Sequence, residues 1–301
     1  MADARTLVTT HRATRAFEPT TVLRGTLDDA AELIARHSPV AVLTGAGIST
    51  DSGVPDYRGP GSQRATPMLY SEFVHDEDNR RRYWARSYEG WARMGHADPN
   101  VGHRVLARWE QHDAGPRLAG LVTQNVDGLH ETAGSRRLVT LHGRIADVVC
   151  LDCGDVSPRA ELQQRLARLN PGVRPRADAG HAELRPDGDA VVDAWAGFRV
   201  AGCRRCGGTL KPDVVYFGEP VPVERVRRAY EIVDAAGVLL VAGSSLTVMS
   251  GLRFARHAVR RGRPLIIVNH GATRADELAA VRLDLNTSVA LKGLSERFGI
   301  A

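Results

Sequence analysis

The sequence predicts an α/β protein built on a parallel sheet, and three observations predict it. Short apolar runs alternate with segments of helical periodicity, the apolar runs end in clusters of small or polar residues, and two C-x-x-C pairs interrupt the alternation. We therefore expect a Rossmann-like parallel sheet domain with a smaller zinc-binding plus helical module inserted. Because open parallel sheets bind ligands beyond the carboxyl ends of their strands, the clusters should converge on one crevice.

The first elements follow from local signals. Thr26 and Asp29 have the spacing of an N-cap and an acidic third helical residue, which predicts a helix over 27–37. The apolar run 39–43 predicts a strand that enters a glycine turn, with a further helix beginning near Ser49. The next segment does not read as a second strand. Residues 51–100 instead predict a long loop that carries one helix, over 77–94.

The alternation then resumes and is interrupted once more. Between the two cysteine pairs, residues 159–198 are polar and are interpreted as an excursion from the fold. Elsewhere the apolar periodicity predicts helices over 103–113 and 252–261 and strands over 118–122, 138–141, 238–242 and 264–268.

Bulk composition limits the class of protein. The 301 residues are 43% hydrophobic and 25% charged, as in ordinary globular enzymes, and no apolar run is long enough to cross a membrane. The net charge of +5 is carried by arginine, since Lys211 and Lys292 are the only lysines. Without a compact basic run with interleaved aromatics, we expect no direct nucleic-acid partner and no membrane partner. Residues 1–20 lack the apolar core of a signal peptide, so we expect an N-terminal arm and a cytoplasmic protein. The arginine bias fits a bacterial genome rich in G and C, and we expect a monomer.

The glycine turn Gly45-Ala46-Gly47 indicates a dinucleotide site, because glycines let backbone N–H groups approach a pyrophosphate. A bare tight turn is the alternative. Thr50 stands where a dehydrogenase fingerprint has its third glycine or alanine, and no second strand with a ribose-binding acid follows promptly. Hydride-transfer chemistry is therefore disfavoured.

Two polar clusters follow later strands. Asn125 and Asp127 can orient a ribose hydroxyl, a carboxamide or a water, although Asp127 could equally cap the next helix. His142 lies at a strand end beside a glycine, where an imidazole can serve as a general base. The chain has 11 histidines, so a structural role for His142 is the alternative.

The cysteines give the most specific single signal. Cys150 and Cys153 form one C-x-x-C pair, Cys203 and Cys206 form the other, and 49 residues separate the pairs. Two such knuckles supply four thiolates, which predicts a closed and therefore structural zinc site. A pair of disulfides or a redox couple is the alternative.

Taken together, these motifs resemble those of the sirtuin (Sir2) family of NAD-dependent protein deacylases. The resemblance extends over residues 40–289 and rests on the motifs GAGIS, PDYR, TQNVD, LHG, the paired C-x-x-C, KPDVVYFGE, GSSL and VN in that order. Tyr57, the phrase YWAR at 83–86, the run 134–138 and the long gap between the cysteine pairs resemble the class II branch.

The resemblance implies a role for each cluster. NAD would be a consumed co-substrate, with Tyr57 near the nicotinamide and Gln124, Asn125 and Asp127 around the nicotinamide ribose. An acyl-lysine peptide would add as a strand beside residues 214–218. The implied cofactor residues are Gly45, Ala46, Gly47, Ser49, Asp56, Tyr57, Arg58, Gln124, Asn125, Asp127, Gly243, Ser244, Ser245, Asn269, His270, Gly271 and Val289, and the implied substrate residues are Val214, Val215, Tyr216, Phe217 and Gly218.

The implied reaction starts when the substrate's acyl oxygen attacks the ribose as nicotinamide leaves. His142, Asn125 and Asp127 would be the catalytic residues, and His142 would take a proton from a ribose hydroxyl. The products would be free lysine, nicotinamide and O-acyl-ADP-ribose, while one zinc ion would support the fold. Tyr57 replaces a phenylalanine common in the family. Tyr83 and Arg86 have the Tyr-x-x-Arg spacing of acidic-acyl readers, but their register differs by one residue from that pair, which favours a packed and solvated helix face instead.

Two rival functions remain at this stage: a protein mono-ADP-ribosyltransferase, and a non-catalytic zinc-ribbon protein that only senses NAD. The expected division of the chain is an arm (1–25), a Rossmann-like NAD-binding domain (26–55, 98–146 and 212–301), a cofactor loop with a helical insertion (56–97) and a zinc-binding module (147–211).

Overall fold

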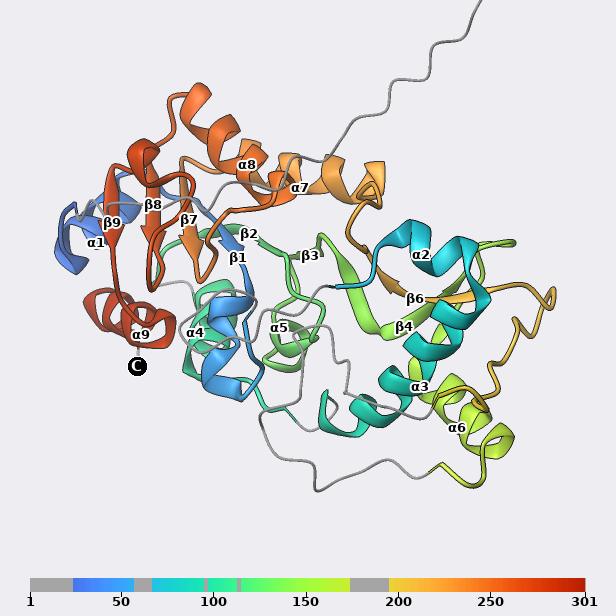
Figure 1. Ribbon diagram of the computed structural model, residues 1–301. Helices are drawn as coiled ribbons and strands as arrows, with labels where there is room; N and C mark the ends of the chain where they lie inside the picture. Colours follow the sequence, from blue (N-terminus) through green and yellow to red (C-terminus); the bar gives the residue numbers. More distant parts are fainter. Residues whose placement is uncertain (1–23, 57–66, 95–96, 113–114, 174–194, 301) are drawn as a thin grey trace, which may run out of the picture.

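The computed structural model describes residues 24–56, 67–94, 97–112, 115–173 and 195–300. Two bodies lie side by side in it (Figure 1): a six-stranded sheet covered by helices, and a smaller body built around three strands. Within the part of the chain that is described, no helix is both long and apolar enough to span a bilayer.

The large sheet has the strand order β3-β2-β1-β7-β8-β9, and every neighbouring pair is parallel. The predicted Rossmann-like sheet is therefore confirmed. From β1 the chain adds strands first toward one edge of the sheet (β2, β3) and later toward the other (β7, β8, β9), so the topological switch point lies between β1 and β7. The strands are β1 (Val40–Thr44), β2 (Leu118–Thr123), β3 (Leu138–Thr140), β7 (Val238–Ala242), β8 (Leu265–Val268) and β9 (Val281–Leu283).

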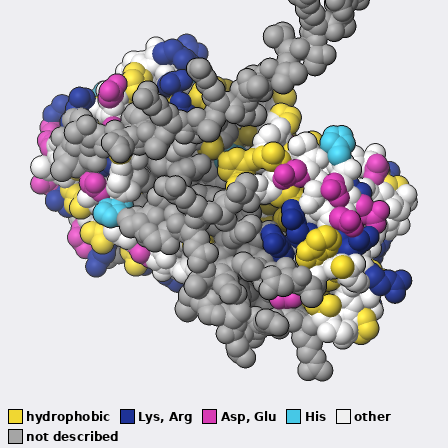
Figure 2. Space-filling model, viewed as in Figure 1, with side chains coloured by type: hydrophobic (Ala, Val, Ile, Leu, Met, Phe, Trp, Pro, Cys, Tyr) yellow, Lys and Arg dark blue, Asp and Glu magenta, His cyan; other side chains and the backbone are white. Residues whose placement is uncertain are grey.

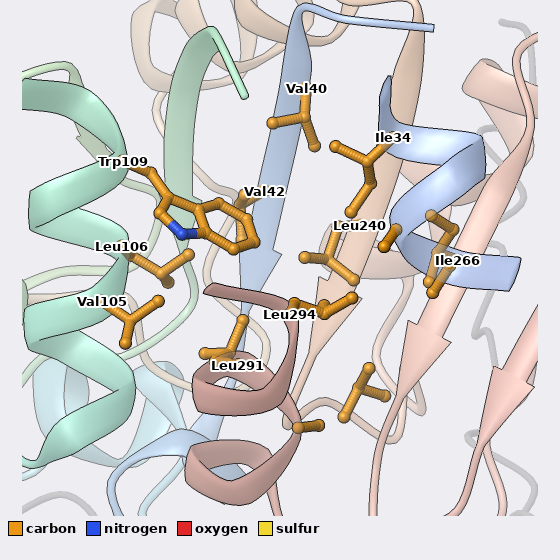
Figure 3. Packing of buried hydrophobic residues seen from close by; sticks show 14 of the residues in the cluster. Ile34, Val40, Val42, Val105, Leu106, Trp109, Leu240, Ile266, Leu291 and Leu294 are labelled. Atoms are coloured by element: carbon orange, nitrogen blue, oxygen red, sulfur yellow. The ribbon is translucent and has the colours of Figure 1, made fainter. Parts of the chain in front are cut away.

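Helices cover both faces of this sheet, which explains why its strands are continuous apolar runs. Val40 and Val42 of β1 face one core with Trp109 (Figure 3), while Ala41 and Leu43 face the other. The first core is closed by α1 (Leu27–Arg36), α4 (Val101–Gln111) and α9 (Thr287–Arg297), and the second by α7 (Val223–Ala235) and α8 (Met249–Arg260).

The smaller body has its own core and an antiparallel sheet of order β5-β4-β6. Trp84 and Leu166 are fully buried in this core. Its elements are α2 (Tyr70–His75), α3 (Glu77–Met94), β4 (Gly143–Cys150), β5 (Val156–Pro158), α6 (Arg159–Leu169) and β6 (Leu210–Val214). Both predicted boundaries of the zinc module, at 147 and 211, fall inside strands of this sheet, in β4 and β6 respectively.

Several predicted elements match the structure closely. The helix over 77–94 is α3, and Thr26 and Asp29 form the expected capping box at the start of α1. Apart from α3, the described residues between 51 and 100 hold only two short helical segments, η2 (Thr50–Ser52) and α2.

Three expectations were wrong. An α-helix does not begin near Ser49; two short 3-10 turns, η1 (Ala46–Ile48) and η2, follow β1 instead, because Gly53 in the left-handed region ends the second turn. The polar excursion 159–198 begins with the regular helix α6, whose Leu162 and Leu166 are buried. Finally, α8 starts at Met249 rather than at 252, which brings Ser250 into its first turn.

On the described part of the face in Figure 2, lysine and arginine side chains are interspersed with acidic ones over both bodies.

Candidate functional site

The polar clusters converge as predicted at the carboxyl edge of the large sheet. Hydrogen bonds between side chains join the loops after β1, β2 and β7, and His142 follows β3 directly. This edge includes the switch point between β1 and β7, where doubly wound folds bind nucleotides.

The glycines of the first loop are required by the neighbouring loop. A Cβ atom at Gly45 would lie 2.8 Å from Ser244 Cβ, and one at Gly47 would lie 3.0 Å from Gly243 Cα. The N–H groups of Gly45 and Gly47 donate to the carbonyls of Ala242 (3.4 Å) and Gly243 (2.8 Å). These glycines therefore let the loops after β1 and β7 interlock, and their amides are engaged in that contact rather than directed at a ligand.

Ser49 connects that first loop to the polar cluster after β2. Its Oγ donates to Asp127 Oδ2 at 2.7 Å and accepts from Asn125 Nδ2 at 2.9 Å. The other carboxylate oxygen of Asp127 accepts from the Leu129 N–H at 3.0 Å, at the start of α5 (Leu129–Thr132). Asp127 therefore takes part in the polar cluster and forms an Asx turn with Leu129, but the N-cap of α5 is Gly128, so the alternative of Asp127 as the capping residue was wrong by one position.

Gln124 links the same cluster to the loop after β7. Its Nε2 donates to Ser244 Oγ at 2.7 Å and to the Thr44 carbonyl at 3.3 Å. Ser245 Oγ instead lies 2.9 Å from Thr247 Oγ1 within its own loop. Ser244 is thus fixed by the loop after β2, and Ser245 by a contact within its own loop.

A buried arginine stabilises the loop after β8 through hydrogen bonds to its backbone. Arg282 is fully buried, forms a 2.7 Å ion pair with Asp276, and donates to the carbonyls of Asn269 (3.0 Å) and Gly271 (2.5 Å). His270 is exposed and lies 3.0 Å from Asp284. Arg282 and Asp276 were missed from the sequence, since six residues separate them and no motif marks the pair. Val289, in α9, is 60% exposed.

His142 is fixed at both ring nitrogens. Nδ1 lies 2.8 Å from the Gln124 carbonyl, and Nε2 lies 2.8 Å from Ser250 Oγ. Because a carbonyl only accepts, Nδ1 carries the proton and Nε2 of the neutral ring is the basic nitrogen.

The surroundings of His142 keep it neutral. Burial lowers the pKa of His142 to about 4; the hydrogen bond to Gln124 opposes this shift and the Arg225 cation adds to it. Arg225 lies against the residue after the histidine, since a Cβ atom at Gly143 would be 2.8 Å from its Nη1. At neutral pH the imidazole is therefore able to accept a proton.

Two further histidines lie beneath the cluster and were missed as site neighbours. The rings of His103 and His130 pack edge to face at 4.7 Å. His103 Nε2 is 3.4 Å from Ser49 Oγ, and His130 Nε2 is 2.9 Å from Thr44 Oγ1. Burial lowers the pKa of His103 to about 4, with Asp127 opposing, and burial also lowers the pKa of His130 well below its ordinary value. Helical spacing alone marks His103 as a core position, so nothing in the sequence separates it from structural histidines.

The predicted substrate segment adjoins the histidine directly. The Val215 N–H donates to the His142 carbonyl at 2.8 Å, which places residues 214–218 beside the crevice. The Phe217 carbonyl accepts from the Tyr70 N–H at 2.9 Å, so the helical insertion borders the same segment. Val214 and Tyr216 are buried, Phe217 and Gly218 are exposed, and Gly218 has a left-handed φ of 84°.

Tyr83 lies next to this segment. Its ring centroid is 5.5 Å from those of Tyr216 and Phe73, and the side chain is 2% exposed. Arg86 is half-buried one helical turn later. The two side chains therefore start from one face of α3, and Tyr83 belongs to the aromatic core that borders the substrate segment.

The four cysteines form one cluster in the smaller body. Their Sγ atoms all lie within 4.8 Å of one another, with Cys150 and Cys206 at 3.5 Å and Cys153 and Cys203 at 3.8 Å. Tetrahedral zinc with bonds of about 2.3 Å separates its sulfur ligands by about 3.8 Å. The cluster fits a structural zinc ion, as predicted, and the four thiols are not joined as disulfides.

Part of the predicted cofactor loop cannot be placed. Asp56 is half-buried at the end of a described segment, whereas Tyr57 and Arg58 lie outside the described residues.

Comparisons with known proteins agree with this architecture. The profile of the Sir2 family matches residues 45–250. The chain is 54% identical over 258 residues to NAD-dependent protein deacetylase 1 of Mycobacterium avium, which covers 85% of this chain and 90% of that protein. A solved structure of Sir2 with a p53 peptide and NAD+ superposes with a TM-score of 0.72 at 27% identity, covering 92% of this chain and all of that one. A Sir2 structure bound to acetylated peptide gives a TM-score of 0.70 at 25% identity, with the same coverage. The chain belongs to the Sir2 family.

Proposed function

We propose that this chain is an NAD-dependent protein-lysine deacylase in which His142 is the general base. The observation that carries the proposal is the geometry of His142: a neutral ring with a defined basic nitrogen, at the carboxyl edge of a Rossmann-like sheet and bonded through its own carbonyl to the predicted substrate segment. Membership of the Sir2 family and the deacetylase relatives support the NAD-dependent activity.

NAD supplies the ADP-ribosyl group that receives the acyl group. In the proposal, Gln124, Asn125 and Asp127 surround the nicotinamide ribose, since their polar atoms gather where β1, β2 and β7 end. The cofactor residues predicted around them keep that assignment as part of the proposal. Nε2 of His142 takes the proton of a ribose hydroxyl, and its low pKa keeps it free of a proton before that step.

The acyl-lysine peptide is proposed to add its backbone to residues 214–218, between the crevice and the helical insertion. Exposed Phe217 and Gly218 offer backbone and side-chain surface there, and buried Tyr216 lies against Tyr83. This contact supports Tyr83 as part of the wall near the acyl group. A role for Arg86 as an acidic-acyl reader, like the class II assignment, stays a prediction.

The proposed division of the chain gives the NAD-binding domain the large sheet and gives the zinc module the cysteine cluster. The four reduced cysteines suit a cytoplasmic enzyme, which is the location we propose.

The test is nicotinamide release from NAD by the purified protein, with and without a panel of acyl-lysine peptides (acetyl, longer aliphatic, branched, acidic and lipoyl). We expect release only with an acyl peptide, together with free lysine peptide and O-acyl-ADP-ribose in the mass spectrum. The chain itself is a weak source of acyl-lysine, because Lys211 is buried in an ion pair with Glu219 and Lys292 is its only other lysine. Release without acyl peptide, accompanied by ADP-ribose on protein, would favour the ADP-ribosyltransferase instead.

A further inference from the structure

Ser250 contacts the reactive nitrogen of the proposed base although it belongs to none of the sequence motifs discussed above. It lies in the first turn of α8, where its Oγ is 2.8 Å from His142 Nε2. The first turn of α8 packs tightly on the same region: a Cβ atom at the next residue, Gly251, would lie 2.5 Å from Gln124 Oε1. A glycine at 251 therefore lets the serine come close to the ends of β2 and β3.

A serine in the first turn of a helix commonly caps that helix. In α8, however, the capping position is Val248, which makes no side-chain capping bond, and the Ser250 hydroxyl is directed at the imidazole. The contact between Ser250 and His142 therefore does not serve to cap α8.

The direction of the hydrogen bond follows from the other end of the ring. Nδ1 donates to the Gln124 carbonyl, so neutral Nε2 has a lone pair and the Ser250 hydroxyl donates to it. After Nε2 gains a proton, the same hydroxyl can turn and accept, because a hydroxyl has both a donor and acceptor lone pairs.

We propose that Ser250 is a positioning residue for His142. Its hydroxyl holds the imidazole plane so that Nε2 faces the crevice. When a substrate hydroxyl binds, that hydroxyl replaces Ser250 as the donor to Nε2. Once the substrate O–H bond has broken, Ser250 accepts a hydrogen bond from Nε2–H. Arg225 of α7 is the charged group that acts on the ring, and its charge is paired with Asp213 of β6 at 2.5 Å. Ser250 is the uncharged side chain that bonds to His142 Nε2. This role rests on the proposed function of His142.

The test compares Ser250→Ala with wild type in two reactions. The first is deacylation of an acyl-lysine peptide. The second is exchange of labelled nicotinamide into NAD in the presence of that peptide, which reports the step before His142 acts. We expect Ser250→Ala to lower kcat for deacylation about tenfold, with exchange and the KM for NAD within about twofold of wild type. Ser250→Thr keeps a hydroxyl and should restore most of the rate.

A matched control is Ser71→Ala, since Ser71 is an exposed serine at the same position of another helix, α2. It should leave both reactions unchanged. A second readout does not need NAD: the ¹⁵N resonance of His142 Nε2 should move in Ser250→Ala and stay in Ser71→Ala.

Three outcomes would overturn the role. Deacylation by Ser250→Ala within twofold of wild type would do so, as would exchange falling in parallel with deacylation, or an Nε2 resonance that does not respond. In each of these cases the proposed function stands as long as the wild-type protein deacylates the peptide and exchanges nicotinamide. A wild-type protein that does not deacylate would overturn the proposed function itself.

Discussion

The NAD crevice and the cysteine cluster both draw on the segment from Gln124 to Cys153, yet they are assembled differently. The crevice is closed by side-chain contacts that cross the whole fold: Ser49 to Asp127 spans 78 residues, His142 to Ser250 spans 108, and Gln124 to Ser244 spans 120. The cysteine contacts span 50 and 56 residues and stay within the smaller body. The relative positions of the reactive side chains thus depend on the packing of the large sheet, whereas the cysteines hold together only the smaller body. Substitutions in the cysteine cluster should therefore lower stability, whereas substitutions in the crevice should lower activity and leave the fold intact.

The largest effect is expected from the cysteine cluster. Cys203→Ser should release the zinc and lower the unfolding temperature by at least about 10 °C, because a structural metal contributes its binding free energy to folding. Deacylation should fall with it. Zinc content by atomic absorption and thermal unfolding measure both changes, and NAD should not protect against chelation.

The matched control for that prediction is Arg205→Ser in the same knuckle, since the Arg205 side chain is exposed while its backbone N–H, which contacts Cys203 Sγ, is retained. It should keep zinc and stability. A zinc-free protein with full stability and activity would contradict a structural role for the cluster.

The second effect concerns chemistry alone. His142→Ala should lower deacylation at least about 100-fold, as expected for loss of a general base, while the unfolding temperature stays within a few degrees. Steady-state nicotinamide release should fall in step, because each turnover passes through the lost proton transfer.

His37→Ala is the control for this variant, since His37 is exposed at the end of α1. It should behave as wild type. Nicotinamide release that is unchanged in His142→Ala would refute the proposed base. If His142→Ala instead unfolds the protein, the distinction between a chemical crevice and a structural cluster is lost.

The sequence was sufficient for the parts whose signals are local. Apolar runs ending in glycine or polar residues predicted five of the six strands of the large sheet, and the C-x-x-C spacing predicted the metal cluster; the three-residue strand β9 was missed. The smaller sheet was missed because β5 has only three residues and the eight residues of β4 alternate irregularly between buried and half-buried positions.

Contacts between distant segments could not be predicted in the same way. Ser250 was missed because the apolar pattern places the start of α8 at residue 252, three residues after its actual start, and so leaves Ser250 outside the helix. Arg282 supports the loop after β8 through a buried charge that composition cannot distinguish from surface arginines. In both cases the decisive information is tertiary packing, which no local pattern carries.

The smallest effect separates the two regions by pH. Burial lowers the pKa of His103, beneath the polar cluster, to about 4 from its ordinary value of about 6.5, so the folded state disfavours its proton. A depressed histidine pKa leaves stability intact above pH 6.5 and removes it as the pH falls toward 4, because the unfolded chain then binds more protons. For this shift the loss at pH 5 is about 2 kcal/mol relative to pH 7.

Urea unfolding at pH 7 and pH 5 measures this loss, and His103→Gln isolates it. Glutamine does not titrate, so the variant should lose about 2 kcal/mol less than wild type between the two pH values, whatever the acid does to the zinc thiolates. His37→Ala serves again as the control, since an exposed histidine should leave the pH dependence unchanged. Equal losses in wild type and His103→Gln would show that acid destabilises the protein through another group, and His130 and His142, whose pKa values burial also lowers, would then be the first to examine.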